Sequence, residues 1–354
     1  MEYMSAREAA DKWGISQRRV ALLCAEQRIP DAVMVGNMWI IPALAKKPND
    51  ARCTRYTEDG KAVKPFLKWA GGKKQLLDEL ASYYPFSDKI TKYAEPFVGG
   101  GAVLFDVLSK FELDEIYIND VNVELMNTYY VVRDNIDILI ALLSAYQDAF
   151  LPMSAEQRRA YYVAKRERFN RLKISNNEKE NIEKAALMIF LNKTCFNGLY
   201  RVNRKGLFNV PMGAYKNPVI CNEANLRAVS EKLQHVVIAC GDYRKSAEFI
   251  DQNTFVYFDP PYRPISSTSG FTAYTEDRFE DTEQIALAEF VKSMEKKGAK
   301  IVISNSDPKN ENIDDDFFDN LYADFNIKRV EAVRMINSNA EARGKIKELL
   351  ISNY

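Results

Sequence analysis

Short apolar runs alternate with amphipathic segments from about residue 65 to the C-terminus. The clearest run, residues 254–258 (Thr-Phe-Val-Tyr-Phe), has no polar interruption and is typical of a strand buried on both faces. A helix is expected from Ala102 to Lys110, directly after a glycine turn. Further strands are predicted at residues 92–97, 115–119, 236–239, 300–304, 328–336 and 347–352. This alternation predicts an α/β fold with a mostly parallel sheet.

A long segment with helical spacing of apolar positions interrupts this alternation. It includes predicted helices over residues 153–173 and 181–191. Asn203-Arg204-Lys205-Gly206 then predicts the turn of a basic hairpin running from Leu199 to Val210. We therefore expect an inserted domain within a larger sheet domain. The expected boundaries are residues 127–225 for the insertion and residues 65–126 and 226–354 for the sheet domain.

The N-terminal residues 1–48 have the pattern of a separate small module, and a polar linker is expected at residues 49–64. A capping box at Ser5 and Glu8 opens a helix that ends at Trp13. The next elements expected are a helix over residues 17–27 and a hairpin over residues 33–41 that turns at Gly36-Asn37.

Two helices followed by a hairpin resemble the small winged helix-turn-helix domains of MerR and excisionase type. The resemblance implies a DNA-binding module in which Arg18 and Arg19 contact phosphates or bases. The alternative is a docking or stabilising module without DNA contact.

The composition is that of a globular protein without a membrane segment. No apolar stretch is long enough to span a bilayer, and the N-terminus has no signal-peptide pattern, so a cytoplasmic location is expected. The five cysteines are scattered and form no Cys-x-x-Cys pair, which predicts reduced thiols and no metal site. Because His235 is the only histidine, mechanisms that need a histidine base are disfavoured.

The net charge is zero, but the charges are unevenly distributed. Residues 158–216 contain 14 Lys and Arg against 4 Asp and Glu, whereas residues 251–324 contain 7 against 16. The first region can attract a polyanion although the whole chain is neutral. A solvated basic helix face is the alternative, but it accounts less well for the aromatic residues and glycines within this region.

Residues 95–101 (Glu-Pro-Phe-Val-Gly-Gly-Gly) lie between a predicted strand and a predicted helix. Glycines at such a turn let a ligand approach the backbone closely. The spacing is not Gly-x-Gly-x-x-Gly, which favours a ligand without a pyrophosphate. Asp120 ends the next strand, where an acid can accept both ribose hydroxyls. These features favour an adenosine-containing ligand over a simple helix-capping turn.

Two further motifs carry candidate chemistry. Residues 68–73 (Lys-Trp-Ala-Gly-Gly-Lys) precede a helix and suit binding of an amino-acid carboxylate, although they also fit a helix entry with surface lysines. Asp259, Pro260 and Tyr262 belong to Asp-Pro-Pro-Tyr at the end of the buried strand. The carboxylate and a proline carbonyl can accept two hydrogens of an exocyclic amine, while the ring stacks on a flat base. This motif suits amine methylation, but alone it also fits a strand-to-turn segment.

In chain order, the motifs at residues 68–73, 95–101 and 259–262 together resemble the Dam family of DNA adenine-N6 methyltransferases. The resemblance runs from about Pro65 to the C-terminus, so the N-terminal module lies outside it. Shorter matches occur at residues 190–192, 196–201, 208–211, 271–274 and 303–305. The resemblance implies a Rossmann-like, S-adenosylmethionine-dependent methyltransferase sheet, with residues 127–225 as the target-recognition domain. It also implies an enzyme that methylates a flipped adenine in double-stranded DNA.

The resemblance implies roles for individual residues. Asp259, Pro260 and Tyr262 would be catalytic, through direct methyl transfer without a metal. The residues implied to bind S-adenosylmethionine are Trp69, Lys73, Phe97, Gly99, Asp120, Asp242, Tyr243 and Asp259. Those implied to bind DNA are Lys68, Leu199, Arg201, Asn203, Arg204, Lys205, Pro211 and Tyr215. Arg201 would read a guanine and Tyr215 would act as a wedge, which suggests GATC or a related site.

Two other functions remain as alternatives. An RNA adenine methyltransferase more often carries Asn-Pro-Pro-Tyr, and the DNA-type hairpin argues against it. A DNA-binding regulator with an inactive catalytic domain is disfavoured by the intact motifs. The interpretation is compatible with a partner restriction endonuclease and leaves the oligomeric state open.

Overall fold

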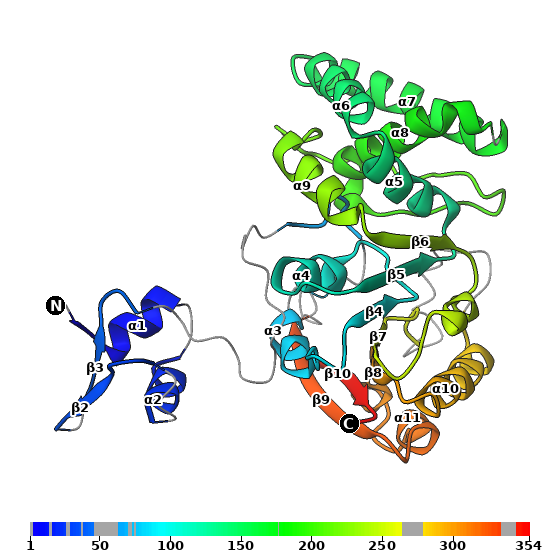
Figure 1. The fold of residues 1–354 in the computed structure, drawn as a ribbon. Helices are drawn as coiled ribbons and strands as arrows, with labels where there is room; N and C mark the ends of the chain where they lie inside the picture. The colour runs from blue at the N-terminus through cyan, green and yellow to red at the C-terminus, as the bar shows by residue number, and fades with distance from the viewer. Residues whose placement is uncertain are drawn as a thin grey trace. The chain divides into compact units, whose positions relative to one another are not determined.

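The structure is a computed structural model that describes residues 3–13, 16–25, 29–36, 38–45, 63–69, 73, 76–175, 177–263, 279–333 and 345–354. It divides into two compact units, Met1–Tyr56 and Thr57–Tyr354 (Figure 1). Of the predicted linker over residues 49–64, only Val63 and Lys64 lie within the described residues.

The smaller unit packs two helices against a three-stranded antiparallel sheet with strand order β1-β3-β2. The bounds are β1 Tyr3–Ser5, α1 Ala6–Trp13, α2 Gln17–Ala25, β2 Val33–Val35 and β3 Met38–Pro42. The capping box forms as expected, since the Glu8 amide donates to Ser5 Oγ (3.2 Å) and the Ser5 amide donates to Glu8 Oε2 (2.7 Å). The two helices and the hairpin are confirmed, whereas β1 is an additional strand.

The larger unit is built on a seven-stranded sheet with strand order β6-β5-β4-β7-β8-β10-β9. The bounds are β4 Lys92–Glu95, β5 Glu115–Asp120, β6 Val236–Cys240, β7 Thr254–Phe258, β8 Lys300–Ser306, β9 Asn326–Val333 and β10 Lys345–Ser352. Strands β4 to β8 pair in parallel, and β10 runs antiparallel to both of its neighbours. The mostly parallel, Rossmann-like α/β sheet is confirmed. Strand β4 ends two residues before the predicted boundary, because Pro96 has no amide hydrogen for the ladder.

Helices connect these strands and cover the sheet (Figure 1). Leu287 and Val291 of α10 (Asp281–Glu295) pack with β7, β8 and β10 in one buried cluster. The remaining helices of the sheet unit are α3 Leu77–Leu80, α4 Ala102–Lys110, α9 Glu223–Leu233, α10 Asp281–Glu295 and α11 Phe317–Leu321. Short 3-10 helices occur at Ala81–Tyr83, Glu178–Glu180, Phe196–Gly198, Tyr243–Glu248 and Pro308–Asn310. None of the described helices is long and apolar enough to cross a membrane.

A group of helices follows β5 and forms the helical insertion, which we define as residues 123–222. Its helices are α5 Val123–Asp134, α6 Ile136–Phe150, α7 Ala155–Ser175 and α8 Asn181–Thr194. Helix α8 is buried along most of its length between α5, α6 and α7. Helices α7 and α8 confirm the predictions for residues 153–173 and 181–191.

The chain after α8 reverses at the predicted residues, but the hairpin has isolated bridges instead of continuous strands. These bridges join Val202 to Phe208 and Cys195 to Met212. The Asn203 amide donates to the Leu207 carbonyl (2.9 Å), which closes the turn.

The strand order reverses its direction between β4 and β7. From β4 the chain proceeds to β5 on one side, while β7 is followed by β8 on the other side. In open α/β sheets, such a switch point creates a crevice at the carboxyl ends of the strands, where ligands bind. The glycine turn after β4 and the Asp259 motif after β7 therefore lie at adjacent strand ends.

Candidate active site

Asp259 follows β7 directly and is held by two side chains through the same oxygen. Lys73 Nζ lies 2.8 Å from Asp259 Oδ1, and Ser304 Oγ donates to Oδ1 at 2.8 Å. The Lys73 side chain is only 6% exposed, whereas that of Asp259 is 21% exposed. Among the described residues, none donates to Oδ2. One carboxylate oxygen is thus fixed by the protein, and the other remains available to a ligand.

Tyr257, within β7, completes the support of Asp259 from the protein interior. Its buried hydroxyl lies 2.9 Å from Ser304 Oγ. Because Ser304 donates its only hydroxyl hydrogen to Asp259, Tyr257 must be the donor to Ser304. Tyr257 donates to Ser304, and Ser304 donates to Asp259. These two hydrogen bonds fix the orientation of the carboxylate.

Tyr262 is linked to the same lysine. Lys73 donates a short hydrogen bond to the Tyr262 hydroxyl, which in turn donates to Glu348 Oε2 at 2.8 Å. Lys73 Nζ also lies 4.2 Å from the centroid of the Tyr262 ring. Burial, followed by the negative charges of Asp259 and Glu348, raises the pKa of Tyr262 well above its ordinary value. The phenol therefore stays protonated in the physiological pH range.

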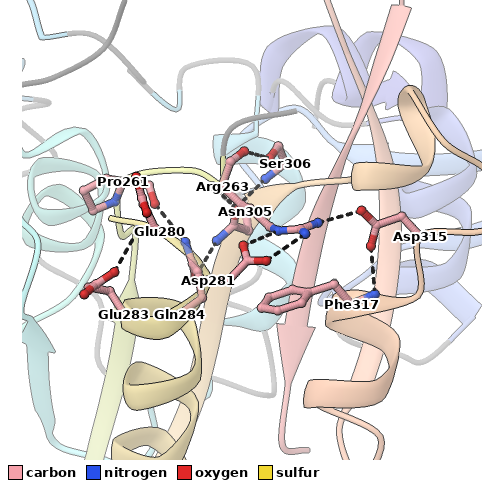
Figure 2. Close-up of polar contacts among 10 residues, drawn as sticks. All are labelled: Pro261, Arg263, Glu280, Asp281, Glu283, Gln284, Asn305, Ser306, Asp315 and Phe317. Atoms are coloured by element: carbon pink, nitrogen blue, oxygen red, sulfur yellow. Dashed lines mark hydrogen bonds and ion pairs between the residues drawn. The ribbon is translucent and has the colours of Figure 1, made fainter. Parts of the chain in front are cut away.

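The backbone after Pro260 is braced by side chains from α10 and β8 (Figure 2). Gln284 Nε2 donates to the Pro261 carbonyl (3.0 Å), and Gln284 Oε1 accepts from Asn305 Nδ2 (3.2 Å). Asn305 Oδ1 accepts from the Arg263 amide (3.2 Å), while Ser306 Oγ donates to the Arg263 carbonyl (3.0 Å). The backbone on both sides of Tyr262 is consequently fixed to the core of the sheet.

The guanidinium of Arg263 extends this brace. It donates to both oxygens of Asp281 (2.6 and 3.0 Å) at the start of α10, and to Asp315 Oδ2 (2.7 Å). Its carbon lies 4.3 Å from the centroid of the Phe317 ring. Figure 2 shows Arg263 between these groups. Bidentate pairing with stacking uses the planar geometry of arginine, which lysine does not reproduce.

The turn after β4 is joined to the end of β5. Asp120 Oδ2 accepts from the Gly99 amide (3.1 Å), and Asp120 Oδ1 accepts from the Asn122 amide (2.9 Å). Burial raises the pKa of Asp120, while these amide hydrogens act in the opposite direction. Gly99 has a φ of 48°, a conformation that favours glycine.

Asn119 connects three strand ends at this edge. Its Nδ2 donates to the Pro96 carbonyl after β4 (3.2 Å) and to the Gly241 carbonyl after β6 (2.8 Å). Its buried Oδ1 has no hydrogen-bond partner within the described part of the chain. A buried acceptor of this kind indicates a polar ligand or a water molecule at the same strand ends.

Aromatic rings form one wall beside these strand ends. Phe97 and Tyr243 lie 5.3 Å apart between ring centroids, and Tyr243 is almost fully buried. The neighbouring Asp242 is half-exposed and accepts from the amide and the guanidinium of Arg244 (2.8 and 3.0 Å). A ring wall, a nearby carboxylate and Asp120 at the next strand end together suit an adenosine group.

Trp69 is packed between the glycine turn and the helical insertion. A Cβ atom at Gly99 would lie 2.9 Å from Trp69 Cδ1, and one at Gly100 would lie 2.7 Å from Trp69 Cβ. On its other side, the indole stacks on the buried ring of Tyr200 (5.6 Å between centroids). The two glycines thus make room for the indole. Tyr200 links the loop that carries Trp69 to the insertion.

Asn192 on α8 forms a second link between the same segments. Its Nδ2 donates to the carbonyls of Lys68 (2.7 Å) and Gly198 (2.9 Å), and its Oδ1 accepts from the Lys68 amide (2.8 Å). Gly198 has a φ of 64°, and a Cβ there would lie only 2.5 Å from Lys68 Cβ. Lys68 Nζ in turn lies 4.1 Å from the centroid of the Tyr215 ring. Lys68 and Tyr215, both expected to contact DNA, are therefore neighbours.

The other residues of the larger unit expected to contact DNA belong to the insertion, in the segment from Leu199 to Pro211. Arg201 is exposed, and its Nε donates to Asn209 Oδ1 at 2.8 Å. Asn203 accepts from the amides of Lys205 and Leu207, so its side chain closes its own turn. The rest of this group is exposed or partly buried, namely Leu199, Arg204, Lys205 and Pro211. In the smaller unit, Arg18 is exposed on α2, and the side chain of Arg19 lies outside the described residues.

Several residues at the site were not singled out from the sequence. Asn192 and Ser304 lie inside quoted motifs, and a polar residue within an apolar run was the available signal. Glu348 gave a similar signal in the predicted strand at residues 347–352. Phe196 is 52% exposed, and Asn197 next to it has a φ of 53°.

The described residues contain no group of three or more His, Cys, Asp or Glu side chains that could hold a metal ion. Gly71 and Gly72 of the Lys-Trp-Ala-Gly-Gly-Lys motif lie outside the described residues, as does the match at residues 271–274.

Comparison with known proteins gives a family match over residues 69–336 to the model described as D12 class N6 adenine-specific DNA methyltransferase. The type II methyltransferase M.MjaIII of Methanocaldococcus jannaschii is 50% identical over 296 residues, covering 82% of this chain and 99% of the relative. The type II methyltransferase M1.LlaDCHI of Lactococcus lactis subsp. cremoris is 38% identical and covers 82% and 96%. The DNA adenine methylase of Escherichia coli K12 is 33% identical and covers 82% and 95%.

Proposed function

The chain belongs to the D12 class of N6 adenine-specific DNA methyltransferases, and from this premise we propose how its residues divide the work. The reaction is transfer of a methyl group to the N6 atom of adenine in DNA. S-adenosylmethionine supplies that methyl group, carried on a positively charged sulfur atom.

We propose that Asp259 Oδ2 accepts one hydrogen of the target amino group and that the Pro260 carbonyl accepts the other. The N6 lone pair is delocalised into the adenine ring and is therefore a poor nucleophile. These two hydrogen bonds would localise electron density on the nitrogen and orient its lone pair. The observation that supports this role is that Lys73 and Ser304 both contact Oδ1 and leave Oδ2 available.

Tyr262 would stack on the extruded adenine through the ring face not covered by Lys73. A base inside a duplex cannot reach Asp259, so it must leave the helix at a cost of a few kcal/mol. Tyr215 was expected to act as a wedge; because it packs on Lys68, we assign to the exposed Phe196 the role of filling the space that the base vacates.

For the methyl donor, we propose a pocket at the carboxyl ends of β4, β5 and β6. Asp120 would bind the ribose hydroxyls, while Phe97, Asp242 and Tyr243 would surround the adenine. Trp69 and Gly99 would line the side nearest to the insertion. Lys73 was expected in this pocket; because it bonds to Asp259 and Tyr262, we assign it to the reaction centre.

Residues 127–225 would form the target-recognition domain, which would read the DNA sequence together with Lys68. Arg201 is suited to a guanine through its O6 and N7 acceptors, and Leu199 and Pro211 to a thymine methyl group. The basic turn residues Asn203, Arg204 and Lys205 would contact phosphates, and Tyr215 would support Lys68. We propose GATC or a close variant as the target.

We propose that the smaller unit adds DNA contacts through Arg18 and Arg19 on α2. The hairpin β2–β3 exposes apolar side chains, including Val33, Met34 and Met38. Phosphate contacts by this unit would therefore come from its helix. We further propose that the protein acts on chromosomal DNA in the cytoplasm. Methylation would protect that DNA from a partner endonuclease.

The test is methylation of duplex oligonucleotides by the purified chain with S-adenosylmethionine. We expect N6-methyladenine in a GATC duplex and at least about a hundredfold loss of rate in Asp259→Ala. Ser304→Ala should lose less, since Lys73 still holds Oδ1 in that variant. Methylation of a different adenine context would refute the target, and an Asp259→Ala variant with parental activity would refute the mechanism.

A further inference from the structure

A continuous series of polar side chains crosses the active site. It starts at Tyr257 on β7 and ends at Glu348 on β10, with Asp259 in the middle. In order, the members are Tyr257, Ser304, Asp259, Lys73, Tyr262 and Glu348. Tyr257, Ser304 and Lys73 support Asp259, Tyr257 through Ser304 and the other two directly. Within the described residues, Glu348 reaches the site through the Tyr262 hydroxyl.

The direction of each hydrogen bond at Tyr262 is fixed by chemistry. A lysine ammonium group can only donate, and a carboxylate can only accept. The Tyr262 hydroxyl therefore accepts from Lys73 and gives its one hydrogen to Glu348. With both functions of this hydroxyl engaged, the edge of the ring is held from two sides.

Glu348 itself is held rigidly. It lies in β10, where it pairs with Ser306 of β8 on one side and with Val330 of β9 on the other. Its neighbour Leu349 is fully buried, while Lys347 is exposed. The carboxylate is thus anchored by a strand with partners on both edges, next to the strand that carries Ser304.

We propose that Glu348 is a positioning residue for methyl transfer. It fixes the Tyr262 ring in the plane where the target adenine stacks, and it keeps Lys73 shared between Tyr262 and Asp259. Without Glu348, the phenol hydrogen loses its acceptor and the ring can tilt. This inference rests on the proposed stacking role of Tyr262.

The test compares variants of a parent whose methylation activity is first established. The variants are Glu348→Ala, Glu348→Gln, Tyr262→Phe and the double variant Tyr262→Phe/Glu348→Ala. The measurements are the single-turnover methylation rate, the dissociation constant for the donor, and the fluorescence of 2-aminopurine placed at the target position of a duplex.

We expect Glu348→Ala to lower the single-turnover rate by about 10- to 100-fold, with donor affinity unchanged. Glu348→Gln should restore the rate to within about fivefold of the parent, because the amide oxygen can still accept the phenol hydrogen. Bound 2-aminopurine should remain bright in Glu348→Ala, since its stacking on Tyr262 is less ordered.

The double variant distinguishes positioning from general stabilisation. If Glu348 acts through the Tyr262 hydroxyl, Glu348→Ala has no further effect once that hydroxyl is absent, so the two losses are not additive. Lys347→Ala, at an exposed position of the same strand, is the matched control and should match the parent. Additive losses, or a parental rate in Glu348→Ala, would overturn the inference. Absence of methylation in the parent would instead count against the proposed function.

Discussion

At the scale of single residues, some polar atoms are fixed by contacts within the protein and others are left available to a ligand. Asp259 presents one oxygen because Lys73 and Ser304 occupy the other. Within the described part of the chain, the side chain of Arg201 bonds to Asn209 alone and is exposed. An arginine that binds guanine O6 and N7 needs an accessible guanidinium, with one nitrogen held by the protein and the others available to the base.

Arg201→Ala should relax discrimination at one guanine of the target by about 1–3 kcal/mol. The lost contact is bidentate, so substitution of that guanine should no longer reduce the methylation rate. Rates measured on duplexes that differ at a single position check this expectation. Lys205→Ala, in the same turn, should weaken binding equally for all sequences. An Arg201→Ala variant with parental preference would contradict the assignment.

Lys193 on α8 is destabilising at neutral pH. Burial, with a smaller contribution from the charge of Lys68, lowers the pKa of Lys193 to about 8. The unfolded chain keeps this proton up to about pH 10, so the free energy of unfolding should rise between about pH 8 and pH 10. We propose that this cost is retained because the ammonium group of Lys193 binds a DNA phosphate.

Lys193→Met should therefore raise the free energy of unfolding at pH 7, by on the order of 1 kcal/mol. It should also remove the increase above pH 8 and weaken duplex binding. Denaturant titrations at pH 7 and pH 9.5, with duplex affinity measured in parallel, check both effects. The exposed Lys179→Met is the control and should change neither. A less stable Lys193→Met would contradict this account.

At the scale of elements, buried strands and their carboxyl ends were predictable, while side-chain partnerships across distant elements were not. An unbroken apolar run such as residues 254–258 determines a central strand, and the strand determines where Asp259 lies. The pairing of Tyr262 with Glu348 joins positions 86 residues apart, and local patterns carry no information on it.

Strand β1 was missed because three residues before a helix show no period. The continuous hairpin was replaced by isolated bridges because Asn170 holds the backbone of Phe208 through both of its polar groups.

Tyr200, like Asn192, joins the loop that carries Trp69 to the insertion. Its ring stacks on Trp69, and its hydroxyl accepts from Lys173 (2.9 Å) and donates to Glu124 (3.0 Å). The loop proposed to bind the donor and the turn proposed to read DNA therefore share one buried ring.

Tyr200→Leu should lower affinity for the donor and for the target duplex, each by about 3- to 10-fold, because an aromatic pair of this kind contributes about 0.5–1.5 kcal/mol. Tyr200→Phe keeps the stack and should retain most donor affinity. Equilibrium titrations of each variant with S-adenosylhomocysteine and with duplex test both effects. If Tyr200→Leu affects only DNA binding, the ring does not connect the two elements.

At the scale of the whole molecule, the chain has two compact units and regions of opposite charge. The family match begins at residue 69, after the smaller unit. Residues 158–216 are strongly basic and residues 251–324 strongly acidic, although the whole chain has zero net charge, so attraction to DNA depends on orientation. Binding that relies on the insertion should weaken steeply with salt.

Removal of residues 1–56 should leave the single-turnover methylation rate unchanged and lower affinity for long duplexes. The reason is that the larger unit contains all the residues proposed for catalysis and donor binding. Methylation rates at saturating DNA and affinities at two salt concentrations distinguish the two effects. In the full-length chain, Arg18→Ala should reproduce part of the affinity loss. Parental affinity in the truncated chain would favour a docking module.

The close packing of Gly198 against Lys68 also sets a rule for changing target preference by transplanting segments between relatives. A Cβ at that position would lie 2.5 Å from Lys68 Cβ and 2.6 Å from Lys68 Cδ, so any side chain there would displace Lys68 or the segment that carries Gly198. A segment transplanted from a relative that starts at Leu199 leaves the Gly198–Lys68 contact unchanged. A segment that starts earlier must have a glycine at position 198. New specificities should therefore be easier to obtain downstream of the glycine than across it.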